Sequence, residues 1–496
     1  MTALNTAGAA TEPAPCKADT AASSLRILTC GSVDDGKSTL IGRLLWDTTD
    51  LYDDQRAQIA GESAGGVAAT PDFSRLLDGL LAEREQGITI DIAWRYFDTP
   101  ARRIVVIDSP GHEQYTRNMA SGASHADVAI VLVDARHGIK PQTRRHAAIL
   151  ELMGVRRVVL AVNKMDLAAY DAARFQSIAD EFGELAVRLG FAHHLAIPVV
   201  ATTGENVARR SQNMEWYSGP ILAESLDAAE ARHANLTHSF RMPVQIVLRD
   251  GADFRGLAGS ITAGRVRVGD EIVSVVSGRS AHVTRLATFD GDLESAETGM
   301  AIVIGLDRDL DIARGDVLAI EPPPAADEIV ARLVWLSETP FHREARYLIR
   351  TASDLVTLEH AEVTGRIDLH TLDVGPSAGA NVNDIVVARL SLSRPAALEQ
   401  FASARDTGSF LLIDGLSGAT LAAGVAITAS RRAVAEVRRP TSHRTTYLLT
   451  REALARGLCR DLGQGPADQA EFERRTEELV RILEAAGIVV ERPGGC

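Results

Sequence analysis

The sequence predicts an α/β domain built on a doubly wound, mostly parallel sheet, followed by two small β-barrels and a short α/β or helical tail. From about residue 25 to 215, apolar strand patterns alternate with helical patterns, which favours parallel strands with helices between them. Near Met242 the chain changes to short β-rich runs with glycine turns, such as RGLAGSITAGRVRVGDEIV, which are typical of small barrels. After Arg431, charge and helical spacing return, as in AEFERRTEELVRILEAAG.

These changes divide the chain into five expected segments. A run of three prolines, Pro322, Pro323 and Pro324, marks a linker between the two barrels. The first residues are rich in Ala and Thr and lack the basic start and apolar block of a signal peptide. The expected segments are a disordered lead-in (1–24), the α/β domain (25–238), a first barrel (239–325), a second barrel (326–432) and a tail (433–496).

Composition excludes several classes of protein. The formal charge of −14, from 66 acidic and 52 basic residues, argues against a broad nucleic-acid surface. No apolar run approaches the ~18 residues that a membrane span needs. The cysteines show no CxxC spacing, so neither a disulfide framework nor a zinc site is indicated; they are Cys16, Cys30, Cys459 and Cys496. We therefore expect a cytoplasmic protein without nucleic-acid or membrane partners.

A phosphate-binding loop follows the first expected strand. The pattern Gly-x-x-x-x-Gly-Lys-Ser lies between the apolar run LRILT and the helical pattern LIGRLLW, which is the strand–loop–helix context that a P-loop requires. Backbone N–H groups would surround the phosphates, Lys37 would reach the outer ones, and Ser38 would ligate Mg²⁺. A helix is expected to begin near Lys37. The residues expected to contact the nucleotide here are Gly31, Ser32, Val33, Asp34, Asp35, Gly36, Lys37, Ser38 and Thr39.

A second motif selects the base. Asn163-Lys164-Met165-Asp166 ends the strand pattern VVLAVNK. The carboxylate of Asp166 can accept hydrogen bonds from guanine N1–H and its 2-amino group, which adenine does not offer. Asn163 and the stem of Lys164 would support the loop and the plane of the base. The sequence therefore predicts binding of GTP and GDP rather than adenine nucleotides.

Two further segments are expected to sense the γ-phosphate. Asp108-Ser109-Pro110-Gly111 follows the strand pattern IVVID, so that Asp108 would hold Mg²⁺ through water and the Gly111 N–H would face the γ-phosphate. Gly87-Ile88-Thr89-Ile90 matches a switch segment, in which Thr89 would join the Mg²⁺ and γ-phosphate shell. The expected Mg²⁺ ligands are thus Ser38, Thr89 and Asp108.

His112 is expected to orient the attacking water, because it directly follows the DSPG segment. The alternative, an ordinary surface histidine, is less favoured in this context. Lys37 and Thr89 complete the expected catalytic set. Four other histidines lack such a context and are interpreted as structural; they are His137, His146, His193 and His194.

Several segments resemble a known family. GITIDIAWRYF, IDSPGHEQYTRNM and QTRRHAAI resemble the translation-factor class of GTPases, whose plan, as in elongation factor Tu, is also a GTPase domain followed by two β-barrels. Within that class, LLDGLLAEREQGITIDIAWRYFDT, DARHGIKPQTRRH and TGSFLLIDGLSGATLAAGV resemble the GTPase subunit of bacterial sulfate adenylyltransferase. The likeness covers roughly residues 25–430. The loop reads SVDDGKST, where translation factors usually carry His-Val-Asp-His before Gly-Lys-Thr.

The resemblance implies a division of labour. A smaller partner subunit of the ATP-pyrophosphatase fold would make adenosine 5′-phosphosulfate and pyrophosphate from ATP and sulfate, in a heterodimer or higher assembly. This chain would hydrolyse GTP to drive that step. The family commonly has Ser-Ala at Val200-Ala201, where a backbone N–H at Ala201 would contact guanine O6. Two alternatives are a translation factor that delivers a charged tRNA, and a GTP-dependent assembly or signalling module.

The tail resembles an internal piece of adenylylsulfate kinase, with which some members of the family are fused. Arg460-Asp461-Leu462-Gly463 matches that kinase, whereas Thr450-Arg451-Glu452-Ala453 stands where its Asp-Gly-Asp-Asn is expected. The only candidate for a second P-loop, residues 415–420, lacks the Gly-Lys pair, and the chain stops at Cys496. We therefore expect a remnant without kinase activity, with a role in docking the partner or a separate kinase as the alternative.

Overall fold

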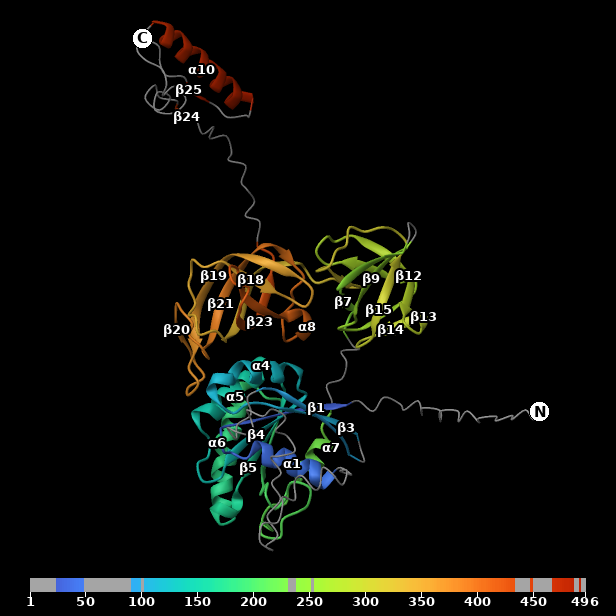
Figure 1. The fold of residues 1–496 in the computed structure, drawn as a ribbon, viewed down its shortest axis with the longest axis vertical. Helices are drawn as coiled ribbons and strands as arrows, with labels where there is room; N and C mark the ends of the chain where they lie inside the picture. The colour runs from blue at the N-terminus through green and yellow to red at the C-terminus, as the bar shows by residue number, and fades with distance from the viewer. Residues whose placement is uncertain are drawn as a thin grey trace, which may run out of the picture. The chain divides into compact units, whose positions relative to one another are not determined.

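The computed structural model describes residues 24–48, 91–99, 102–230, 238–250, 254–432, 447–448, 466–485 and 490–491. Contacts divide the chain into two compact units, Met1–Arg431 and Arg432–Cys496 (Figure 1). Several predictions lie outside the described residues. These concern the lead-in up to residue 23, the switch segment Gly87–Ile90 with Thr89, the residues Thr450–Ala453 and Arg460–Gly463 of the tail, and Cys16, Cys459 and Cys496.

The first unit begins with the predicted mostly parallel sheet. Its strand order is β2-β3-β1-β4-β5-β6. All neighbours are parallel except the edge strand β2, which runs antiparallel to β3. The strands are β1 (Leu25–Gly31), β2 (Ala93–Asp98), β3 (Arg103–Asp108), β4 (Val128–Asp134), β5 (Arg157–Asn163) and β6 (His193–Pro198).

Helices cover both faces of this sheet, because successive strand residues alternate between two apolar cores. Leu28 of β1 packs in a core with helices α4, α5 and α6, whereas its neighbour Ile27 packs in a second core with α1 and α7. This alternation is the period of two expected of a strand that is buried on both sides. The helices are α1 (Lys37–Thr48), α4 (Thr116–His125), α5 (Pro141–Leu152), α6 (Ala172–Leu189) and α7 (Leu222–Asp227).

Most of the predicted strands appear in the structure, with one difference at the edge. The pattern AIPVVA at 196–201 predicts a strand through residue 201, but β6 ends at Pro198. Beyond it the N–H of Val199 still bonds the carbonyl oxygen of Val162, and Val200 turns away to pair with Glu205. Pro198 itself is tolerated because β6 is an edge strand.

The first barrel encloses one apolar core, with Phe240, Leu257, Ile272 and Ile304 among its buried members. Its main sheet runs β7-β16-β11-β12-β15-β9-β8, and β13 pairs with β12. A separate pair, β10 and β14, completes it. The strands are β7 (Arg241–Pro243), β8 (Ile246–Asp250), β9 (Phe254–Ser260), β10 (Arg265–Arg267), β11 (Glu271–Ser274), β12 (Ser280–Thr288), β13 (Gly291–Leu293), β14 (Ser295–Glu297), β15 (Ala301–Leu306) and β16 (Val317–Ala319).

The second barrel is closed. Six strands run in the order β18-β22-β23-β17-β21-β19, and β19 pairs back to β18, so no edge remains in this ring. Trp335 is fully buried inside it and packs edge-on against Phe341. The strands are β17 (Ala326–Trp335), β18 (Tyr347–Arg350), β19 (Leu355–Ile367), β20 (Val374–Pro376), β21 (Ile385–Ala396), β22 (Ser409–Asp414) and β23 (Thr420–Ser430), with the short helix α8 (Arg405–Gly408) before β22.

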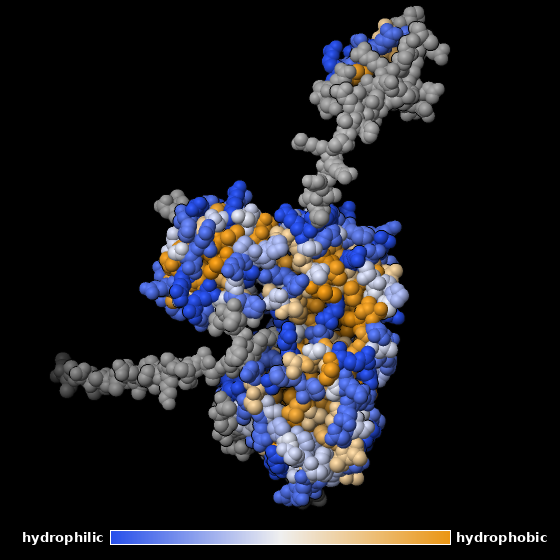
Figure 2. All heavy atoms as spheres, turned by 180° about the vertical axis from the view of Figure 1, so that it is seen from behind, coloured by the Kyte–Doolittle hydropathy of each residue, from blue (hydrophilic) through white to orange (hydrophobic). Residues whose placement is uncertain are grey.

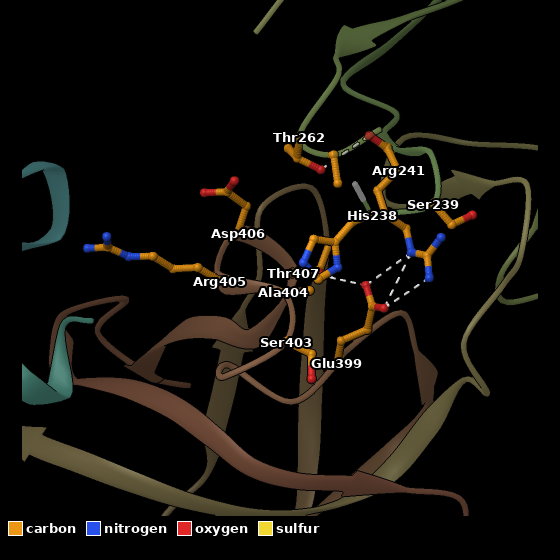
Figure 3. Close-up of a pocket in the computed structure, with 11 residues that line it drawn as sticks. His238, Ser239, Arg241, Thr262, Glu399, Ser403, Ala404, Arg405, Asp406 and Thr407 are labelled. Carbon is orange, nitrogen blue, oxygen red and sulfur yellow. Dashed lines mark hydrogen bonds and ion pairs between the residues drawn. The ribbon is translucent and has the colours of Figure 1, made fainter. Parts of the chain in front are cut away.

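Polar contacts join the second barrel to its neighbours within this unit. Arg241 of β7 forms an ion pair with Glu399, at 3.1 Å, and the Thr407 hydroxyl donates to the same carboxylate at 2.7 Å (Figure 3). Arg332 makes a two-pronged ion pair with Glu151 of α5, at 2.7 and 2.9 Å. Because two hydrogen bonds fix each guanidinium plane, these pairs specify how the surfaces meet.

The surface carries apolar as well as polar side chains. Figure 2, seen from behind, shows apolar residues gathered in places among the polar ones. Phe289, after β12, is fully exposed. No helix among the described residues is long and apolar enough to cross a membrane.

The second unit contributes three described elements. They are β24 (Tyr447–Leu448), α10 (Pro466–Ala485) and β25 (Val490–Glu491), and β24 pairs with β25 in parallel. On α10, Arg474 and Arg475 both pair with Glu471, at the helical spacings that bring such side chains together.

Candidate functional site

The P-loop connects β1 to α1, and α1 begins at Lys37 as predicted. Gly36 has a φ of +94°, a conformation that side chains rarely adopt, and a Cβ there would lie 2.5 Å from the Asn163 amide nitrogen. Asp34 also has a positive φ, of +66°. The loop therefore takes an unusual backbone path that glycine permits and that brings it against the end of β5.

Lys37 is buried at the centre of the loop. Its ammonium group donates to the carbonyl oxygens of Gly31 and Ser32, at 3.1 and 3.0 Å. Gly111 lies so close that a Cβ there would collide with the Lys37 nitrogen. Burial lowers the pKa of Lys37, while the negative charge of Asp108 acts against this shift. The DSPG segment and the P-loop lysine are thus brought together.

Asp108 stands at the end of β3, beside the P-loop strand. It is 1% exposed and accepts a hydrogen bond from the Thr29 hydroxyl at 3.0 Å. The next residue, Ser109, donates to the Thr29 carbonyl oxygen at 2.7 Å. The parallel pairing of β1 and β3 sets Thr29 opposite Asp108. These bonds fix the direction in which the DSPGH segment leaves the sheet.

His112 follows on the exposed side of the same segment. Its backbone is extended, and its Nδ1 accepts a hydrogen bond from the Gln114 N–H at 3.3 Å, so that it caps a short 3₁₀ turn, η2 (Glu113–Tyr115). The ring of Tyr115 lies edge-on, 6.0 Å away between centroids. The cap occupies Nδ1, and the other ring nitrogen, Nε2, has no hydrogen-bond partner among the described residues.

The NKMD segment closes the other side of the site. Asn163 donates to the Asp35 carbonyl oxygen at 2.8 Å and accepts from the Ala201 N–H at 3.0 Å. Lys164 donates to the Asp34 carbonyl oxygen. The two residues thus hold the P-loop, the end of β5 and the loop after β6 in one arrangement, and they position a 3₁₀ turn, η3 (Met165–Ala168).

Met165 and Asp166 of that turn differ in burial. Met165 is fully buried, whereas Asp166 is exposed. An anchored backbone with an exposed carboxylate is an arrangement that can read hydrogen-bond donors on a planar ligand.

Asp134 is a residue of this site that sequence reasoning missed. It ends β4 beside Asn163, and it pairs with Lys164 at 3.2 Å and Arg136 at 2.6 Å. Burial by itself would raise the pKa of Asp134, but hydrogen bonds from Arg136 and Lys164 outweigh it and hold that pKa well below its ordinary value. Its place at the carboxyl end of a buried strand was the signal that could have identified it.

Lys140 is a second residue that was missed. It precedes α5 and pairs with the buried carboxylate of Asp35 at 3.2 Å. His146, interpreted as structural, lies buried on α5 beside Gln142. Burial lowers the pKa of His146 to about 3, so this imidazole stays neutral at ordinary pH.

The fold and this arrangement define a GTPase of the elongation factor Tu type. The family model of the elongation factor Tu GTP binding domain matches residues 22–248, and that of the GTP-eEF1A C-terminal domain matches residues 328–427.

More specific relatives are similar over most of the chain. The bifunctional enzyme NodQ of Rhizobium sp. (strain N33) is 41% identical over 94% of this chain and 79% of its own length. The bifunctional enzyme CysN/CysC of Xylella fastidiosa is 40% identical, over 94% of this chain and 82% of its own length. Sulfate adenylyltransferase subunit 1 of Vibrio campbellii is 44% identical, over 83% of this chain and 88% of its own length. The chain therefore belongs to the family of sulfate adenylyltransferase subunit 1.

Proposed function

We propose that this chain is the GTP-binding and GTP-hydrolysing subunit of a sulfate adenylyltransferase. The observation that carries the proposal is the exposed Asp166 on a turn that Asn163 anchors to the P-loop, in a chain of the subunit 1 family. The partner reaction joins ATP and sulfate to give adenosine 5′-phosphosulfate and pyrophosphate. Hydrolysis of GTP to GDP and phosphate accompanies it.

The coupling has a thermodynamic reason. The phosphosulfate anhydride is higher in energy than the ATP bond that is consumed, so sulfate activation alone runs uphill. Hydrolysis of GTP can drive it only if the GTP and GDP states of this subunit favour different conformations of the partner. The proposed switches are the DSPG segment after β3 and the segment Gly87–Ile90, which precedes β2 in the sequence.

The proposed nucleotide contacts are those predicted from the sequence. The P-loop amides and Lys37 would hold the phosphates, and Asp166 would hold guanine. The Ala201 N–H, predicted to contact guanine O6, donates to Asn163 in this structure. The oxygen ligands proposed for Mg²⁺ suit a hard cation that keeps several waters; they are Ser38, Thr89 and Asp108. Of these, Asp108 is held in place by Thr29, which supports the assignment. Mg²⁺ would neutralise charge that develops on the phosphates.

The proposed partner is a smaller subunit of the ATP-pyrophosphatase fold, in a heterodimer or a higher assembly. The name subunit 1 among the relatives implies a second subunit. The proposed location is the cytoplasm, where ATP and GTP are available. Burial raises the pKa of the Cys30 thiol to about 12, so this thiol stays protonated.

A reconstitution tests this function. The purified chain is mixed with the small subunit, ATP and sulfate, and pyrophosphate release is followed with GTP, with a non-hydrolysable GTP analogue, and with no guanine nucleotide. We expect sustained release with GTP, and little with the analogue or without guanine nucleotide. Equal release in all three would contradict coupling. If the chain bound charged tRNA tightly and did not stimulate pyrophosphate release, the translation-factor alternative would be favoured.

We propose further that the tail is not a working adenylylsulfate kinase. The second P-loop candidate is residues 415–420, of which 415–419 connect β22 to β23 and Thr420 begins β23. Their turn is fixed by Asp414, whose carboxylate accepts from the N–H groups of Leu416 and Ser417. No lysine follows there to neutralise a γ-phosphate.

Incubation with ATP and adenosine 5′-phosphosulfate tests the tail. We expect no sustained formation of the 3′-phosphorylated product by the purified chain, and normal formation once a separate active kinase is added as a control. We also expect a chain truncated after Arg431 to hydrolyse GTP at the full rate, because the described site residues all precede it. Product formation without the added kinase would overturn the proposal.

A further inference from the structure

The P-loop contains a buried acid, Asp35, whose side chain takes no part in the proposed nucleotide contacts, which backbone N–H groups of the loop would make. Asp35 is 1% exposed and lies in the middle of the P-loop, one residue before Gly36. One carboxylate oxygen accepts from the Ser32 N–H at 2.7 Å, and the other accepts from the Lys140 ammonium group at 3.2 Å. The first bond closes the turn that starts the loop. The second joins this turn to a residue 105 positions away.

Lys140 is held where it can make this contact. It is the residue immediately before α5, with an extended backbone, and its N–H bonds the Thr143 hydroxyl at 3.3 Å. Pro141 follows as the first residue of the helix, which fixes the direction in which α5 begins. The Lys140 side chain is about one third exposed, whereas that of Asp35 is almost fully enclosed.

A buried carboxylate next to a phosphate site creates a conflict of charge. Burial raises the pKa of Asp35, and Lys140 is the strongest influence acting in the opposite direction; Lys37 also acts in that direction, more weakly. A carboxylate without its partner would either take up a proton or draw the remaining cation toward itself. The remaining cation is Lys37, which the phosphates need.

We propose that Lys140 is a positioning residue for phosphate binding. Its ammonium group neutralises Asp35, fastens the turn of residues 32–35 to the start of α5, and leaves the charge of Lys37 to the phosphates of the nucleotide. This rests on the proposed GTP binding. GTP and GDP both place a β-phosphate in the loop, so loss of Lys140 is expected to weaken both nucleotides alike.

The test is a double-mutant cycle on the full chain, with GDP affinity measured by a fluorescent GDP analogue and by calorimetry. Lys140→Met is expected to weaken GDP and GTP by about 10-fold. Lys140→Arg, which keeps the charge, is expected to bind within about 2-fold of the unchanged chain. In the Asp35→Asn background, where no carboxylate remains to be neutralised, Lys140→Met is expected to cause less than about a 2-fold further loss.

Three results would each overturn the proposal. One is that Lys140→Met lowers GDP affinity by the same factor in the unchanged chain and in the Asp35→Asn background. Another is a failure of Lys140→Arg to restore affinity, and the third is unchanged affinity in Lys140→Met. Should Lys140→Met not fold, Lys140→Gln replaces it, since its amide can still donate to Asp35 without charge, and an intermediate loss is expected. Failure of the unchanged chain to bind GDP would refute the proposed function itself.

Discussion

Replacing Asp166 with Asn is expected to weaken GTP binding by at least about 100-fold and to create affinity for xanthosine triphosphate. A carboxylate accepts both donors on the guanine edge, N1–H and the 2-amino group. An amide in its place offers one acceptor and one donor group, and xanthine presents an acceptor where guanine has its 2-amino donor. Nucleotide titrations of the purified variant with both triphosphates measure the exchange.

The Asp166→Asn substitution is expected to change recognition of the base and to leave the P-loop intact. Asp166 is exposed, and the turn that carries it is held by Asn163 and Lys164 rather than by its own side chain. Asp171→Asn is the matched control. Asp171 caps the next helix, α6, through the Ala173 N–H at 2.9 Å, and Asn caps helices equally well, so GTP affinity should stay unchanged. Full GTP affinity in the Asp166 variant, with none gained for the xanthine nucleotide, would refute the base-reading role.

The parts of the fold that follow from local pattern could be predicted from the sequence. The P-loop sets both the end of β1 and the start of α1, because its glycines and the Lys-Ser pair impose one backbone path. Strands β4 and β5 are continuous apolar runs, as strands buried on both faces must be. The end of β6 could not be predicted from this pattern, because Val199 and Val200 continue the apolar run after the strand has ended.

The parts of the site that depend on distant residues could not be predicted. Lys140 reads as an ordinary surface lysine before a helix, and Asp134 as the polar end of a strand. Their roles depend on the pairing of β4 with β1 and β5. This pairing brings Asp134 into contact with Lys164, and Lys140 into contact with Asp35. A single sequence specifies which residues carry charge, but the sheet order decides which charges meet.

Replacing His112 with Ala is expected to lower GTP hydrolysis by about 100-fold or more while GDP affinity changes little. The side chain is exposed at the end of the DSPG segment, and its Nδ1 is engaged by the Gln114 N–H. That bond fixes the ring, so that Nε2 is the nitrogen able to orient a water molecule beside the γ-phosphate. The ring has no part in holding the P-loop, since the loop is anchored by Asn163 and Lys164.

The measurement is single-turnover GTP hydrolysis in the complex with the partner subunit, together with GDP titration. His125→Ala is the matched control, because His125 lies at the end of α4, where its Nδ1 bonds Ser121 and Ser124 and its ring packs edge-on against Trp94 of β2. It should hydrolyse GTP at close to the full rate. His112→Gln should keep part of the rate, since an amide can also orient water as the glutamine of other GTPases does. If His112→Ala in the partner complex turned over GTP as fast as the unchanged chain, the attacking water would have to be oriented by another group.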